Sequence, residues 1–166
     1  IVDSLVGSEM CIRDSPGSTP MQTGLASWGL AFVGARAPEA LRKAAQSPHA
    51  QIRTAAIAAL GDQIQNLGDE DARQLLTNAL RDADEDVRAE ATTLMGKLNE
   101  SEWAIPLLLP NLQDEAALVR KNAALSLMKL EDPSVISQLQ QCMETESEPS
   151  VAVVLKLAVN QLSCDD

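Results

Sequence analysis

Three arginines recur along this 166-residue chain at a spacing that could place their guanidinium groups in a column. Arg53, Arg88 and Arg120 each follow an isoleucine or a valine, and they lie 35 and 32 residues apart. Asp82 and Asp114 stand six residues before the second and third of them. Such a column could bind an anionic ligand, because guanidinium groups recognise carboxylates and phosphates with paired hydrogen bonds. Alternatively, arginines and aspartates of successive units could pair and serve only to hold the structure together.

The other residues with chemical potential favour structural roles. The acidic run 82–86 lacks the glycine and glutamate that complete a calcium-binding EF-hand, so it is interpreted as a helix-capping turn. His49 is the single histidine and has no cysteine or carboxylate neighbours at ligand spacing. Cys142 falls at an apolar helix position, which suits a buried thiol. Trp28 and Trp103 could be ligand platforms, but gap-filling near a helix start is preferred. We predict no catalytic residue, no metal site and no cofactor.

These residues belong to a repeated pattern. Each arginine is followed three residues later by an alanine and seven residues later by a leucine or methionine. A fourth copy begins at Val151 but has Ala152 in place of the arginine. A segment with apolar residues at i, i+3 and i+4 precedes each copy and predicts a first helix. These first helices are expected at 38–46, 70–81, 102–113 and 133–143. Pro106 is expected in a first turn, whereas Pro110 should kink or break its helix.

The pattern Asp-x-x-x-x-Val-Arg-x-x-Ala-x-x-x-Leu/Met-Gly resembles the HEAT-repeat family, and more narrowly the short bacterial repeats associated with phycobilisome lyases. The resemblance implies an all-α fold, a right-handed α-solenoid of antiparallel helix pairs, with about four units and a partial N-terminal one. The expected units are 24–36 (degraded and partial), 37–68, 69–98, 99–130 and 131–163. The resemblance further implies that Asp82, Asp114, Arg53, Arg88 and Arg120 form a structural ladder between units, which should end at Ala152.

Composition narrows the classes of partner. The net charge is −11, whereas a nucleic-acid-binding protein normally presents a basic face and anionic lipid also attracts basic segments. We therefore expect no nucleic acid and no membrane, and instead a protein partner bound by a monomer. The acidic charge favours a partner with a basic surface. Aromatic residues make up only 2% of the chain, so Ala, Leu, Ile and Val must fill the core of closely packed helices. The sparse cysteines favour a reducing, cytoplasmic compartment.

The first 23 residues are expected to lie outside the repeat domain. Residues 4–15 resemble translated sequencing-adapter sequence, so residues 1–15 are interpreted as an artefact, with a natural flexible tail as the alternative. Residues 16–23 are rich in Pro, Gly, Ser and Thr and read as a linker. Because the chain starts with Ile1 rather than Met, we expect it to be a fragment of a longer protein.

The repeat architecture and the lack of a catalytic constellation predict a non-catalytic scaffold that binds a partner on the solenoid surface, and hence no enzyme. HEAT-like stacks present their second helices on the concave face, which points to outward residues as the partner surface. The candidates are Thr54, Ile57, Thr92, Thr93, Lys121, Leu125 and Met128. The resemblance leaves two alternatives open. The chain could be a subunit of a bilin lyase or isomerase, which attaches a tetrapyrrole to a cysteine of a carrier protein, or a structural spacer within a larger protein.

Overall fold

The computed structural model describes Gly29 and residues 38–163, and every regular element in that part of the chain is helical. The elements follow in the order α3 (Pro38–Ala44), α4 (Ala50–Ala59), α5 (Gly61–Leu67), α6 (Glu70–Ala79), α7 (Glu85–Lys97), α8 (Ser101–Leu108), η1 (Leu109–Gln113), α9 (Ala117–Lys129), η2 (Pro133–Val135), α10 (Ile136–Thr145) and α11 (Pro149–Ser163). The expected tail and linker (1–23), and the degraded unit (24–36) apart from Gly29, lie outside the described residues.

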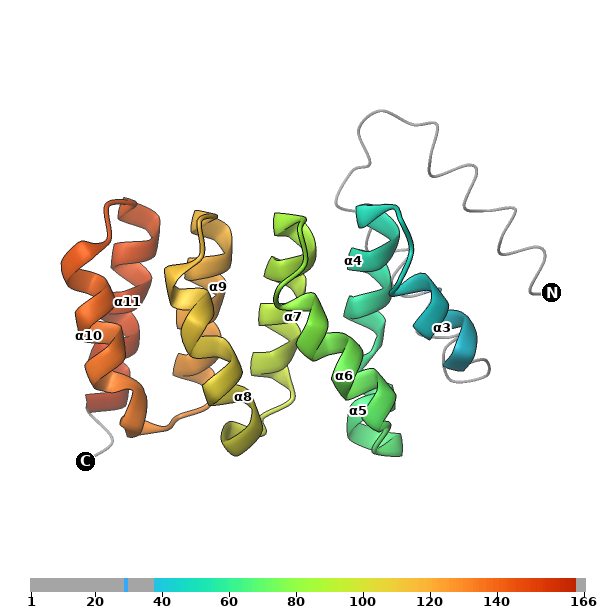
Figure 1. Cartoon of the computed structure of the whole chain (residues 1–166). Coiled ribbons are helices and arrows are strands. Elements are labelled where there is room, and N and C mark those ends of the chain that lie inside the picture. Colours follow the sequence, from blue (N-terminus) through green and yellow to red (C-terminus); the bar gives the residue numbers. More distant parts are fainter. Residues whose placement is uncertain (1–28, 30–37, 164–166) are drawn as a thin grey trace.

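Helix pairs stack side by side in an all-α solenoid of HEAT type (Figure 1). The second helices α4, α7, α9 and α11 pack against one another in that order, and the first helices α3, α6, α8 and α10 lie on one side of them. One continuous apolar core runs from Leu41 to Leu162. Ala56, Ala91 and Ala123, which stand three residues after the ladder arginines, are fully buried in that core. Small side chains at these positions let neighbouring helices approach closely, while leucines fill the space around them.

The turns between units share a backbone conformation that has a physical cause. Gly68, Asn99 and Glu131 all have positive φ, at 60°, 54° and 54°, and each precedes the residue that caps the next helix. In the left-handed conformation, the backbone N–H groups at the end of a helix can donate to its last free carbonyl groups, and the chain changes direction. The capping carboxylates of Asp69 and Asp132 then accept hydrogen bonds from the first amides of α6 and η2.

The structure departs from the predicted helices in three places. The helix expected at 133–143 begins only at Ile136, because the short 3-10 helix η2 occupies its first three residues. Helix α5 was not predicted. It begins at Gly61, one residue after Leu60, the C-cap of α4, and it lies within the longer first spacing of 35 residues. Pro110 lies in η1 just after the end of α8, as expected for a residue that breaks a helix. The placement of Pro106 in a first turn was wrong, because it is the sixth residue of α8.

Among the described residues, no helix is both long and apolar enough to cross a membrane.

The crossing of α7 and α9 depends on Gly96, which gives a first prediction. A Cβ atom at Gly96 would lie 2.5 Å from the Ser126 Cβ and 2.7 Å from its Cα, so the helices would have to separate. Gly96→Ala should lower the free energy of unfolding by about 1–3 kcal/mol, as overpacking does. The control is Gly61→Ala, whose added methyl meets only the end of the Leu94 side chain at 3.2 Å. Urea unfolding followed by circular dichroism measures both variants, and equal stability of the two would contradict the close crossing.

Candidate functional site

The column of arginines is the most regular chemical feature of the molecule. Arg53 Nε and Nη2 donate to the two carboxylate oxygens of Asp82 at 2.8 and 2.7 Å. Arg88 binds Asp114 in the same way, at 2.8 and 2.9 Å. Each pair joins the second helix of one unit to the turn of the next, so the structure brings these predicted residues together in paired hydrogen bonds.

Arg120 completes the column with an acid that sequence reasoning missed. Its Nε and Nη2 donate to the Glu146 carboxylate at 2.8 and 2.9 Å. Glu146 stands six residues before Ala152, as Asp82 stands before Arg88, so the spacing could have identified it. The predicted motif contained only aspartate at this position, although a glutamate carboxylate offers the same two acceptor oxygens. Ala152 offers no further guanidinium, so the column has no donor beyond this pair.

The remaining donor of each guanidinium fixes the turn of its own unit. The Nη1 atoms of Arg53, Arg88 and Arg120 donate to the carbonyl groups of Ser47, Asp82 and Asp114, each at 2.9 Å. The three arginine side chains are only 17%, 9% and 17% exposed. Because Nε, Nη1 and Nη2 are all engaged, the column has little capacity left to bind an external anion.

A second set of ion pairs follows the first helices. Arg42 Nη2 lies 2.6 Å from the Asp69 carboxylate, and Arg73 Nη2 lies 2.6 Å from that of Glu100. The Arg73 guanidinium also lies 4.7 Å from the centre of the Trp103 ring, which makes this half-buried tryptophan part of the packing. Sequence reasoning missed these pairs, although Arg73 follows Arg42 by 31 residues and Glu100 follows Asp69 by the same 31 residues.

The ladder changes the acidity of its carboxyl groups. The hydrogen bonds from Arg120 lower the pKa of Glu146 to about 2, despite the opposing effect of burial. At Asp82 and Asp114 burial is the largest single influence and favours the neutral acid. Hydrogen bonds from Arg53 and Arg88, a backbone hydrogen bond to each carboxylate and the nearby positive charges together outweigh it, so both pKa values are lowered. These acids are therefore fixed as anions at neutral pH and cannot act as proton donors.

Two other groups shift in the opposite direction. Burial raises the pKa of Glu90, which is a half-buried residue of α7. The positive charge of Lys97 lowers this pKa, but by less than burial raises it. Burial likewise raises the pKa of the Cys142 thiol, which accepts a hydrogen bond from Gln113 Nε2 at 3.1 Å. A buried thiol with a raised pKa is a poor nucleophile. Cys11 and Cys164 lie outside the described residues.

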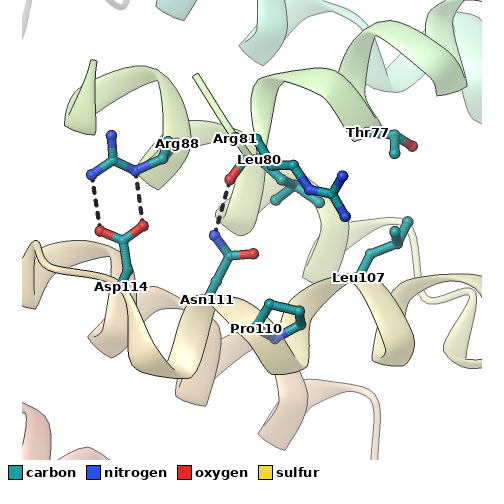
Figure 2. A pocket seen from close by; sticks show the side chains of 8 residues that line it. All are labelled: Thr77, Leu80, Arg81, Arg88, Leu107, Pro110, Asn111 and Asp114. Atoms are coloured by element: carbon teal, nitrogen blue, oxygen red, sulfur yellow. Dashed lines mark hydrogen bonds and ion pairs between the residues drawn. The ribbon is translucent and has the colours of Figure 1, made fainter. Parts of the chain in front are cut away.

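A pocket lies where two units meet beside the ladder (Figure 2). It has a volume of about 210 Å³ and is lined by Thr77, Leu80, Arg81, Arg88, Leu107, Pro110, Asn111 and Asp114. Asn111 is buried and donates to the Leu80 carbonyl at 3.1 Å, and Arg88 is held by Asp114. Ligand pockets for organic molecules usually measure about 300–1,000 Å³, so this one is too small to enclose a multi-ring ligand.

The proposed partner surface needs correction at two residues. Ile57 and Thr92 are 1% and 0% exposed, because they occupy equivalent positions that face the next unit of the stack. Leu125 and Met128 are partly exposed but pack against the core. The half-buried remainder of the predicted surface consists of Thr54, Thr93 and Lys121.

The most exposed apolar side chains of the second helices were not predicted. Leu118, Val153 and Leu157 are 48%, 68% and 52% exposed. Together with Lys121, Leu125 and Lys129 they form what we call the α9–α11 face, which is defined by these six residues. Their signal in the sequence was weak, because apolar residues on such a helix resemble core positions.

Comparison with known proteins places this geometry in a family. The HEAT-repeat profile matches residues 23–94 and 74–158, which together span most of the chain. The chain belongs to the HEAT-repeat family. In sequence it is 40% identical over 144 residues to the bilin biosynthesis protein MpeU of Synechococcus sp. (strain WH8020), covering 87% of this chain and 48% of MpeU. The chain thus spans about half the length of this curated relative.

Solved structures show the same fold. One is the complex of CpcE and CpcF of phycocyanin lyase from Nostoc sp. PCC7120, with a TM-score of 0.68 and 22% identity over 84% of this chain and 90% of the matched chain. Another is human deoxyhypusine hydroxylase, with a TM-score of 0.62 and 24% identity over 88% of this chain and 47% of that one. Among the described residues, no group of three or more His, Cys, Asp or Glu is placed to hold a metal ion.

These comparisons correct the functional prediction. The expectation of a non-catalytic scaffold, and of a protein with no enzymatic role, is wrong, because the relative at 40% identity is a bilin biosynthesis protein. The error came from equating the absence of a catalytic constellation with the absence of a role in a reaction.

The low pKa of Glu146 predicts part of the acid sensitivity. Its folded-state pKa of about 2 lies below the ordinary value of 4.5, so its stabilising contribution is present above pH 4.5 and is lost as the pH falls toward 2. Glu146→Gln should lower the free energy of unfolding by up to about 3 kcal/mol at pH 7 and change it very little near pH 2. Glu144→Gln, at an exposed position in the last turn of α10, the helix that Glu146 follows, is the control. Urea unfolding at several pH values measures the difference, and a constant difference would contradict the prediction.

Glu90 predicts the opposite pH dependence. Because its folded-state pKa is raised, its favourable contribution exists at low pH and is lost as the pH rises through that pKa. The next unit has Asn122 at the equivalent position, where the amide donates to the Ala89 carbonyl at 3.2 Å. Glu90→Gln should therefore stabilise the protein by about 1 kcal/mol at pH 8 and have no effect at pH 4. Thermal unfolding at both pH values checks this, and destabilisation at pH 8 would refute it.

Proposed function

We propose that this chain forms part of a bilin lyase-type subunit that holds a linear tetrapyrrole during its attachment to a carrier protein. The observation that carries the proposal is the 40% identity to the bilin biosynthesis protein MpeU, which extends over 144 residues. An identity over 144 of 166 residues extends over several helix pairs rather than one shared repeat. The fold shared with the CpcE–CpcF complex of phycocyanin lyase agrees with it.

The chemistry of attachment explains how such a chain can take part without a nucleophile of its own. A thiol of the carrier adds across a carbon–carbon double bond of the bilin; the sulfur–carbon bond forms, the thiol proton moves to the neighbouring carbon, and no group leaves. Both reacting groups come from the substrates, so positioning supplies much of the acceleration. This agrees with a buried Cys142 thiol and with ladder carboxylates that are held ionised.

The proposal includes protein partners. Attachment requires a carrier protein that brings the acceptor cysteine. A second HEAT-type subunit is a further partner, since the structurally similar phycocyanin lyase is a complex of CpcE and CpcF. In this proposal the repeat surface binds both the protein partners and the pigment.

Bilin binding by the purified chain is the direct test. Phycoerythrobilin titrated with the chain should show a shifted and sharpened visible absorption band, because a bound tetrapyrrole is held in fewer conformations. Free pigment, and pigment mixed with the urea-unfolded chain, are the controls. An unchanged spectrum at a large excess of folded protein would reject the proposed function.

A further inference from the structure

The charges of this acidic protein are unevenly distributed among its helices. The net charge is −11, yet α9 and α11 contain no aspartate or glutamate. They carry Lys121, Lys129 and Lys156 in addition to Arg120, whose guanidinium is bound to Glu146. Within their bounds the last two second helices therefore carry only basic charges, although the molecule is acidic.

The same surface is apolar between its lysines. Val119 and Val151 are buried at equivalent positions of α9 and α11, which are packed against each other. The repeat spacing of 32 residues then places Lys121 beside Val153, and Leu125 beside Leu157. The two α11 side chains lie one helical turn apart and are more than half exposed.

Earlier in the stack the corresponding positions have a different character. On α7, Asp86 replaces Leu118, Ala89 replaces Lys121 and Thr93 replaces Leu125. Helix α7 also carries the half-buried Glu90. The combination of lysines and exposed apolar side chains is therefore a property of the last two units, and not of the repeat.

We propose that the α9–α11 face is the seat of the tetrapyrrole. This inference rests on the proposed function. A bilin has a flat, hydrocarbon-rich body and two propionate carboxylates, and so is complementary to an apolar surface with lysines. Leu118, Leu125, Val153 and Leu157 contact the rings, and Lys121 and Lys129 bind the propionates.

The dimensions of the face suit this ligand. Lys129 lies eleven positions after Leu118. At a rise of about 1.5 Å per residue, the stripe on α9 is about 16 Å long, and packed helices lie about 8–10 Å apart. The open face can thus accommodate an extended four-ring molecule, whereas the pocket of about 210 Å³ beside the ladder cannot. Exposed ion pairs contribute little, so the apolar contacts should dominate affinity and the lysines should orient the pigment.

The test uses the full chain and two probes, biliverdin and its dimethyl ester, which lacks the propionate charges. Val153→Asp combined with Leu157→Asp should weaken binding of both probes by about tenfold or more. Lys121→Glu should weaken biliverdin binding by about threefold to tenfold and leave the ester unaffected. All three substituted side chains are at least partly exposed, so the fold should survive, and circular dichroism verifies it.

Matched controls come from other units. Leu67 of α5 is 66% exposed, close to the 68% of Val153, and Lys97 of α7 is an exposed lysine on another second helix. Leu67→Asp and Lys97→Glu should change biliverdin affinity by less than about twofold.

The possible outcomes separate the two claims. If the unmodified chain binds neither probe, both the proposed function and this site are wrong. If the chain binds biliverdin and the double variant binds it equally well, only the site is wrong. The double variant could also fail to bind a second HEAT-type subunit and still bind biliverdin with unchanged affinity. That result would show that the face binds protein, and it would also overturn the proposed pigment site.

Discussion

The stack depends on carboxylates that are presented by one unit and bound by the arginine of the unit before. Asp114 shows how the connection is continuous: its carboxylate accepts from Arg88, while its carbonyl group accepts from Arg120 of its own unit. Asp82 has the same two roles between Arg53 and Arg88. One unbroken series of charge-assisted hydrogen bonds thus connects the turns from α4 to α11. A helix pair cannot bury its apolar faces alone, so this series fixes the register in which neighbours complete each other's core.

Such pairs determine geometry more than net stability. Desolvation of each charge offsets much of the attraction, whereas removal of one partner strands the other in a nearly buried position. The ladder therefore penalises misaligned stacking more than it adds to the total stability. It also commits Arg53, Arg88 and Arg120 to structure. The cations that remain available for a ligand on the later second helices are lysines, whose charge is compact and mobile rather than fixed in a fork.

Much of the fold could be predicted from residue spacing, because buried helix faces impose a strict period. The helix pairs follow from this period, whereas the pairing of Arg53 and Arg88 with aspartates followed from the resemblance to HEAT repeats, and the break at Pro110 followed from proline itself. Glu146 was missed because the chemical role was tied to one residue type. Helix α5 was missed because it occurs once. Exposure around a helix changes within one residue, about 100° of rotation. Ile57 was placed on the surface together with its neighbour Ala58, but only Ala58 is partly exposed.

The candidate binding site could not be predicted from the repeat, since it consists of departures from the repeat. Positions that recur are constrained by packing and ion pairing, and they have the same meaning in every unit. Thr93, Leu125 and Leu157 occupy one position of successive helices and change from polar to apolar toward the C-terminal end. Leu125 also packs against the core, whereas Leu157 is 52% exposed and no ladder contact involves it. Selection for a ligand would explain the change, because a reaction between a pigment and a carrier thiol demands a surface that orients the pigment and no catalytic side chain at all. Catalytic side chains therefore carry no information about the proposed role, whereas differences between equivalent positions indicate the surface on which we propose that the pigment lies.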